Sequence, residues 1–218
     1  MKTRVLVVAL LVSIATLVAA PNAWANDTTC VGLVTGVHDN VVVPPGATCT
    51  LTSATVAGSA LVQENAKLFA QFNTVQGNII GDKAEVMDLH SNTLFGAISI
   101  TEGDFNDPEF DVRLVANDVR LGGIKVEKMT GEIVVGVAGQ GNSVNRGNIF
   151  LQENRPVAHF EVNDNTVGQN IQVFKTFGPG VPKAVLSNRA GENLQCFEND
   201  PPFIGGPNTA PNKEGQCF

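Results

Sequence analysis

A repeated segment constrains the fold of this chain more than any other feature. The octapeptide NTVQGNII begins at Asn73 and returns as NTLFGAIS from Asn92 and as NTVGQNIQ from Asn165. The apolar residue after each Asn-Thr pair, or after its counterpart, gives markers spaced by 19, 19, 25, 25, 23 and 23 residues: Val56, Val75, Leu94, Val119, Val144, Val167 and Ala190. Self-similarity at a period of about 20 residues or more is typical of stacked repeats.

Each repeat contains two short segments with alternating apolar residues, which predict β-strands. The first segments span 60–62, 78–80, 97–100, 123–126, 148–151 and 170–173, and the second span 67–69, 85–89, 111–115, 132–135, 158–162 and 184–186. No unit could bury its apolar face alone, whereas coils stacked about 4.8 Å apart could. The sequence therefore predicts an all-β, single-domain parallel β-helix (β-solenoid) of about seven to eight coils with disulfide-stapled ends. An antiparallel β-sandwich is the alternative.

Two residue types recur at fixed places in the repeat. Asparagines precede the marker by one or two residues and form a predicted structural ladder: Asn73, Asn92, Asn117, Asn142, Asn165 and Asn188. Asparagine tolerates left-handed backbone geometry, and stacked amides can bond to one another. Glycines form a second column where a Cβ would not fit: Gly58, Gly77, Gly96, Gly122, Gly147 and Gly191.

The four cysteines give an independent check on this arrangement. Cys30 and Cys49 are 19 residues apart, and Cys196 and Cys217 are 21 apart, so each pair is about one coil apart. Residues one coil apart stack within the Cα separation that a disulfide accepts. Of the three possible pairings, Cys30–Cys49 and Cys196–Cys217 are the ones that this geometry allows. Each bridge would close one end of the stack.

The first residues have the pattern of a secretory signal peptide. A basic start is followed by an apolar run from Val5 to Ala20 and by Ala23-Trp24-Ala25, so residues 1–25 are expected to be removed. The run is shorter than a membrane span requires, and no membrane span is expected after cleavage. Residues 26–196 are assigned to the solenoid and residues 197–218 to an irregular, disulfide-closed cap. A secreted or periplasmic location is expected.

The charge of the mature chain excludes one class of partner. Removing residues 1–25 reduces the 14 basic side chains to 12 against 21 acidic ones, a formal charge of −9. Nucleic acid is not expected as a partner, because binding it requires clustered Lys and Arg.

Three features of the sequence resemble an uncharacterised family of small secreted bacterial β-solenoid proteins, which are right-handed parallel β-helices. They are the run VVVPPGATCTLTSATVAGSALV (41–62), the NTVxGN-type units, and the Cys-bounded segments ENLQC (192–196) and NKEGQC (212–217). The resemblance covers most of the mature chain. It supports the fold and implies no catalytic residue. The V-x-G-x-I rhythm is also similar, more weakly, to bactofilin-type solenoid repeats, although a cleaved signal and disulfides argue against membership of that group.

Candidate functional residues lie where the coils lengthen. The added residues fall between the first and second strands, at Glu102–Glu109, Glu127–Glu132, Gln152–Pro156 and Phe174–Pro182. In repeat proteins such insertions map to one face, often the binding face. We expect them to form a ridge with mixed charge and aromatic rings: Asp104, Phe105, Asp107, Glu109, Lys128, Met129, Arg155, Phe174, Lys175 and Phe177. The alternative is that these segments are variable surface loops that bind no ligand.

Other residues give weaker signals. The acidic run from Asp104 to Asp111 lacks the glycine and terminal glutamate of a calcium loop, so a solvated acidic turn is expected there. His38, His90 and His159 lie in different coils without ligand spacing, and are expected to be half-exposed strand residues. No metal, cofactor or catalytic residue is assigned.

The leading hypothesis is a secreted, non-enzymatic module that is structural or that binds an extracellular polysaccharide or protein, and is a monomer. One alternative is a polysaccharide lyase or hydrolase that uses the acidic run. The other is a surface protein that assembles by stacking coil on coil.

Overall fold

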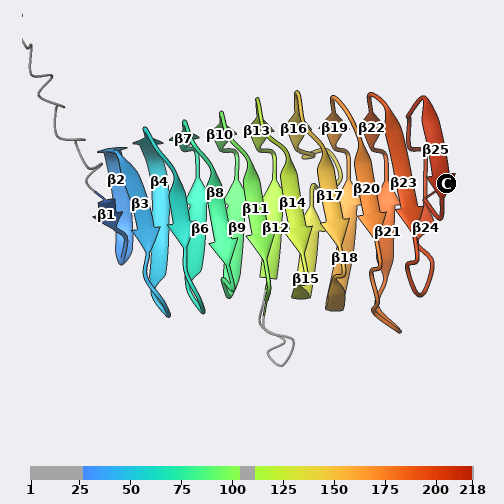
Figure 1. Cartoon of the computed structure of the whole chain (residues 1–218), viewed down its shortest axis with the longest axis horizontal. Coiled ribbons are helices and arrows are strands. Elements are labelled where there is room, and N and C mark those ends of the chain that lie inside the picture. Colours follow the sequence, from blue (N-terminus) through green and yellow to red (C-terminus); the bar gives the residue numbers. More distant parts are fainter. Residues whose placement is uncertain (1–26, 104–110, 218) are drawn as a thin grey trace, which may run out of the picture.

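The computed structural model describes residues 27–103 and 111–217, which form a parallel β-solenoid of about eight turns (Figure 1). All paired strands of the described residues run parallel, as expected when each coil lies on the next. The β-helix predicted from the repeat is therefore confirmed, and the antiparallel sandwich is excluded. Three faces run the length of the stack.

The first face is a ten-stranded sheet that takes one strand from each coil. Its strands, in spatial order, are β1 (Asp27–Thr29), β3 (Asn40–Val43), β5 (Ala60–Val62), β8 (Ile79–Asp82), β11 (Ile98–Thr101), β14 (Ile124–Glu127), β17 (Ile149–Gln152), β20 (Ile171–Phe174), β23 (Asn193–Phe197) and β25 (Asn212–Gly215). The first-strand segments predicted from 60–62 to 170–173 all lie in this sheet.

The second and third faces belong to one fifteen-stranded sheet that bends at β4. The long-strand face contains β2 (Gly32–His38), β4 (Thr48–Val56), β6 (Lys67–Gln71), β9 (Val86–His90), β12 (Asp111–Val115), β15 (Thr130–Val135), β18 (Arg155–Asn163), β21 (Lys183–Leu186) and β24 (Ile204–Gly205). The short-strand face contains β7 (Thr74–Val75), β10 (Thr93–Leu94), β13 (Asp118–Val119), β16 (Ser143–Val144), β19 (Thr166–Val167) and β22 (Arg189–Ala190), along the upper edge in Figure 1. The short strands coincide with the sequence markers.

The core is a set of aliphatic columns inside the stack. One column joins residues paired in register and fully or almost fully buried: Ile79, Ile98, Ile124, Ile149 and Ile171. Burying a side chain of this size contributes about 1.5–3 kcal/mol. Because successive coils place the same residue type at the same position, the columns hold the coils in register.

The asparagine ladder is confirmed, and it has a seventh member in Asn208. Nδ2 of each asparagine donates to Oδ1 of the next at 2.8–3.1 Å, and also to a backbone carbonyl of the preceding coil. The left-handed residue is, however, not the asparagine itself. It is the residue before it, at φ of 54–57°, in Phe72, Ser91, Ala116, Asp164 and Ser187.

A second amide ladder, not predicted, runs in the opposite direction where the last strands of the ten-stranded sheet begin, at β17, β20, β23 and β25. There Asn170, Asn193 and Asn212 each donate Nδ2 to Oδ1 of the asparagine one coil earlier.

The glycine column is confirmed by its packing. A Cβ at Gly77, Gly96 or Gly147 would lie closer than 3.0 Å to the backbone of the preceding coil. Gly168, which the sequence analysis did not include, packs equally closely on Asn145 of the preceding coil, and Gly191 packs on Gly168. The turn between the short-strand face and the ten-stranded sheet is therefore closed by backbone contact.

Both predicted disulfides form. The Cα separations are 5.4 Å for Cys30–Cys49 and 5.5 Å for Cys196–Cys217. The tail was expected to be irregular, and this expectation is wrong in part. Residues 197–218 contribute β24 and β25, which pair with β21 and β23, because the tail retains the length and asparagine positions of a coil. Cys217 is then buried beneath this last coil and accepts a bond from Asn208 through its carbonyl.

Candidate functional site

The predicted ridge begins with a column of left-handed turn residues at the lower edge of the stack in Figure 1. The column follows the ten-stranded sheet and contains Glu102, Lys128, Glu153, Lys175 and Glu198, at φ of 51–60°. Each of the first four donates its N–H to a carbonyl in the next coil. The charge alternates in sign, and Lys128–Glu102 (3.7 Å) and Lys175–Glu153 (3.8 Å) form ion pairs between coils. These exposed pairs set side-chain positions more than they add stability.

Two of the four expected insertions do not form loops in the structure. Only residues 128–129 separate β14 from β15, and only residues 153–154 separate β17 from β18. The added residues extend the strands instead, since Thr130 pairs with Arg155 and Gly131 with Pro156 before a register shift. Arg155 is thus held at the start of a strand, with its N–H bonded to the carbonyl of Met129 at 2.8 Å.

The longer connection after β20 carries Phe177 and is anchored at its base. Phe177 N donates to Asn154 O at 2.9 Å, and Thr176 N donates to Asn199 Oδ1 at 2.9 Å. The buried ammonium of Lys183 donates to Thr176 O at 3.2 Å. Burial lowers the pKa of Lys183, and the nearby Asp200 carboxylate partly opposes this shift.

Arg155 and Phe177 both line each of two hollows at the corner between the two sheets. One, of about 650 Å³, is lined by Arg155, Pro156, Val157, Phe177, Gly178, Pro179 and Val181. The other, of about 450 Å³, is lined by Lys128, Glu153, Arg155, Lys175 and Phe177. We call these last five residues the corner surface. The structure therefore brings Lys128, Arg155 and Phe177 together, as the ridge hypothesis requires.

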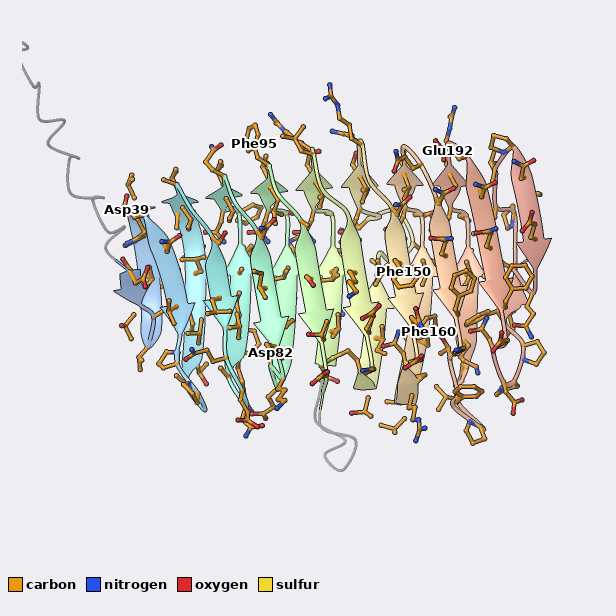
Figure 2. The ribbon with its side chains drawn as sticks, in the orientation of Figure 1. Asp39, Asp82, Phe95, Phe150, Phe160 and Glu192 are labelled. Carbon is orange, nitrogen blue, oxygen red and sulfur yellow. A yellow bond between two sulfur atoms is a disulfide. The ribbon has the colours of Figure 1, made fainter. Side chains whose placement is uncertain are left out.

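Phe174 lies beside the corner surface, at the end of β20. Its ring contacts Phe150 (6.0 Å between centroids, edge-on) and Phe197 (5.9 Å, stacked). Figure 2 labels Phe150 on the ten-stranded sheet. The three rings form a strip across β17, β20 and β23, and its middle ring, Phe174, directly precedes the left-handed Lys175.

Other ridge residues are not part of this surface. Met129 is fully buried, because its side chain points into the core next to Gly103. Asp104, Phe105, Asp107 and Glu109 lie outside the described residues. At the end of the acidic run, Asp111 is in β12 and accepts a bond from Glu132 N.

The three histidines are half-exposed strand residues, as expected. His38 contacts Thr28 Oγ1 (3.0 Å), and His159 contacts Glu161 (3.1 Å). His90 lies 3.4 Å from Gln71 Nε2 and packs edge-on against the ring of Phe72. Across residues 27–103 and 111–217, no group of three or more His, Cys, Asp or Glu side chains is placed to hold a metal ion.

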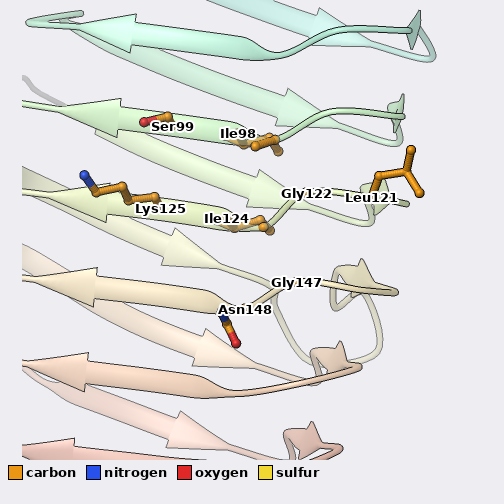
Figure 3. A pocket seen from close by; sticks show the side chains of 10 residues that line it. Ile98, Ser99, Leu121, Gly122, Ile124, Lys125, Gly147 and Asn148 are labelled. Atoms are coloured by element: carbon orange, nitrogen blue, oxygen red, sulfur yellow. The ribbon is translucent and has the colours of Figure 1, made fainter.

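A smaller hollow of about 330 Å³ lies at the glycine turn (Figure 3). Gly122, Gly123 and Gly147 line it and supply no side chain. Lys125, also in its lining, is paired with Glu127 at 2.8 Å, and Asn148 Oδ1 accepts from Asn170. This hollow follows from the close backbone stacking and offers little chemistry.

Sequence reasoning missed one surface completely, a hollow on the outer side of the long-strand face between Thr50 and Arg113. Its outward residues occupy two register positions in successive coils but differ in type from coil to coil, so no repeat signal marks them. Only the pairing of the strands identifies them as neighbours.

No protein-family model, curated protein or solved structure matches this chain. No helix in the described part of the chain is long and apolar enough to cross a membrane.

Proposed function

We propose that the chain is a secreted, non-enzymatic β-solenoid that binds an extracellular polysaccharide at the corner surface. In this proposal residues 1–25 direct secretion, and the chain is related to the small secreted solenoid family that its repeats and Cys-bounded ends resemble. The two disulfides support an oxidising compartment.

The observation that carries the proposal is the position of Arg155 and Phe177 between two open hollows. The Phe177 ring is 42% exposed and offers a flat apolar face to a sugar ring. The Arg155 guanidinium is planar and offers several donors to hydroxyl or carboxylate oxygens. Lys128, Glu153 and Lys175 add charged groups held by the coil register, so the surface is formed before a ligand arrives.

The solenoid adds a second favourable property, since its surface repeats along the stacking axis. The strip of Phe150, Phe174 and Phe197 lies beside the corner surface, with ring spacings of 5.9–6.0 Å. A chain polymer can contact several such groups at once, so weak contacts add up along it.

The test is depletion of the protein, secreted from its full-length precursor, by a panel of insoluble cell-wall and matrix polysaccharides, with reducing ends measured in the same tubes. We expect selective depletion without new reducing ends. Arg155→Ala and Phe177→Ala should each weaken depletion about tenfold, the effect of losing a contact that anchors binding. Leu121→Ala removes a side chain of similar exposure (57%) at the opposite edge and should have no effect.

Three outcomes would oppose the proposal. Depletion that is unchanged in both corner variants would place binding elsewhere. New reducing ends would favour the enzyme hypothesis. Depletion by no polysaccharide would leave a protein partner or a structural role.

A further inference from the structure

The hollow on the long-strand face is formed by the outward side chains of four neighbouring strands. Thr50 in β4, Phe69 in β6, Asp88 in β9 and Arg113 in β12 are paired in register, so they lie in one row across four coils. The adjacent outward row is Thr52, Gln71 and His90. Both rows line a hollow of about 550 Å³. This volume lies within the range of about 300–1,000 Å³ that is typical of small-ligand sites.

The hollow combines an aromatic surface with fixed polar groups. Phe69 is 38% exposed and lies directly beside Asp88 in the row. Gln71 Nε2 is 3.4 Å from His90 Nδ1, and the His90 ring is packed edge-on by Phe72 at 6.2 Å. The amide and the imidazole are therefore held in place, and strands position them more rigidly than a loop would.

Asp88 is retained in this row at a cost to the fold. Burial raises the pKa of its carboxyl, while Arg113 and His90 act to lower it. A neutral side chain would avoid the desolvation, and no core packing requires a carboxyl on an outer face. Costs of this kind are common at binding sites, where stability is given up for recognition.

We propose that this hollow binds one neutral pyranose unit of an oligosaccharide. Phe69 provides an apolar platform for the sugar ring, and Asp88 and Arg113 bind adjacent hydroxyl groups as acceptor and donor. Charge-assisted hydrogen bonds of this kind are short and directional. Gln71 and His90 contact the substituents on the far side of the ring.

The charges of the side chains in this row favour a neutral sugar over an acidic one. Asp88 and Arg113 carry opposite charges in neighbouring coils, so the row has no net charge for an ionic ligand to neutralise. An anionic sugar would gain from Arg113 and lose about as much to Asp88, whereas hydroxyl groups can use both.

The proposed site is separate from the corner surface. It occupies β4, β6, β9 and β12, whereas the corner surface lies on and beside β18 and β20. Failure of one proposal therefore leaves the other standing.

The experiment is a titration of the ¹⁵N-labelled secreted chain with neutral tetrasaccharides of β-1,4-glucose, β-1,3-glucose and β-1,4-mannose, followed by amide chemical shifts. Tetragalacturonate serves as the acidic probe. We expect at least one neutral probe to shift amides of β6, β9 and β12 with a dissociation constant of about 1 mM or below, typical of one small-ligand contact area. The acidic probe should bind more weakly.

Variants then assign the binding groups. Phe69→Ala and Asp88→Asn should each reduce affinity about tenfold. Arg113→Lys keeps the charge but loses the planar donor fork, and should also weaken binding. Leu121→Ala removes an exposed apolar side chain (57%) that belongs to neither proposed binding surface, so it is the matched control and should bind as the unchanged chain does. A dispersed spectrum shows that each variant is folded.

The proposal fails if no neutral probe shifts these amides at about 10 mM, a concentration far above the expected dissociation constant. It also fails if Phe69→Ala binds as well as Leu121→Ala, if the shifts lie on other strands, or if only the acidic probe binds.

Discussion

Asn117 donates a hydrogen bond from Nδ2 to Oδ1 of Asn142 at 3.0 Å, across 25 residues of chain. The same side chain donates to Leu89 O and accepts bonds from Asn92 through both its backbone N–H and its Nδ2. Asn117 is almost fully buried, so the Leu89 carbonyl and the two Asn92 donors depend on its amide for these hydrogen bonds. The ladder therefore links neighbouring coils through the core and not only along the sheets.

Replacing Asn117 by Ala should destabilise the protein strongly. The change leaves the Leu89 carbonyl and two donors of Asn92 without their partner in the interior, and each such group costs about 1–3 kcal/mol. We expect the free energy of unfolding to fall by at least about 3 kcal/mol. Denaturant titration measures it.

The matched control is Asn145→Ala in the next coil. Asn145 is exposed and bonds only to the side chains of Ser143 and Asp118, so its loss should change stability by less than about 0.5 kcal/mol. Equal effects of the two substitutions would show that the ladder does not hold the coils together.

Gly147→Ala tests the close backbone stacking. A Cβ at Gly147 would fall within 3.0 Å of Gly122 backbone atoms, so the two coils would have to separate locally. Gly46 has a left-handed φ of 68° but open space around it, so Gly46→Ala adds only conformational strain, about 1 kcal/mol. In thermal melts Gly147→Ala should lower the midpoint more than Gly46→Ala. The reverse order would contradict a steric origin for the column.

Removing the C-terminal disulfide should loosen the last coil first. For a loop of 21 residues the bridge contributes about 3 kcal/mol, and β25 has only one neighbouring strand. In the double substitution Cys196→Ser and Cys217→Ser, amides of β25 and β23 should exchange hydrogen faster, while those of β8 and β11 stay protected. Uniform loss of protection along the stack would show that the coils unfold as one unit.

Stability should depend on pH through Asp88. Because burial raises the pKa of its carboxyl in the folded chain, the folded state holds the proton more tightly than the unfolded state does. The free energy of unfolding is therefore lowest above the pKa of the folded state. This loss of stability disappears below the pKa of the unfolded state, about 3.9. Asp88→Asn removes this dependence of stability on pH. The two groups that face the carboxyl, Arg113 and His90, are unchanged in this variant.

The melting temperature of Asp88→Asn should accordingly exceed that of the unchanged chain at pH 7, and the two should converge near about pH 3. A lower melting temperature at pH 7 would mean that the carboxylate stabilises the fold through Arg113.

The sequence by itself determined the solenoid, the asparagine and glycine columns and both disulfide pairings. The physical reason is that the spatial neighbour of a residue in a stack lies about one repeat away along the chain, so periodicity in sequence reports contact directly. Asn73 and Asn92 are an example: they are 19 residues apart in the sequence and are joined by two hydrogen bonds to Asn92 Oδ1.

Only the tertiary structure decided which side chains share a surface. Met129 points into the core while Lys128 is exposed, because the left-handed backbone at Lys128 and the extended strand that begins at Thr130 reset the register. Phe69, Asp88 and Arg113 are neighbours with no common residue type, so periodicity carries no trace of them. A repeat specifies the residues that hold the coils together, whereas binding surfaces arise at positions where successive coils differ.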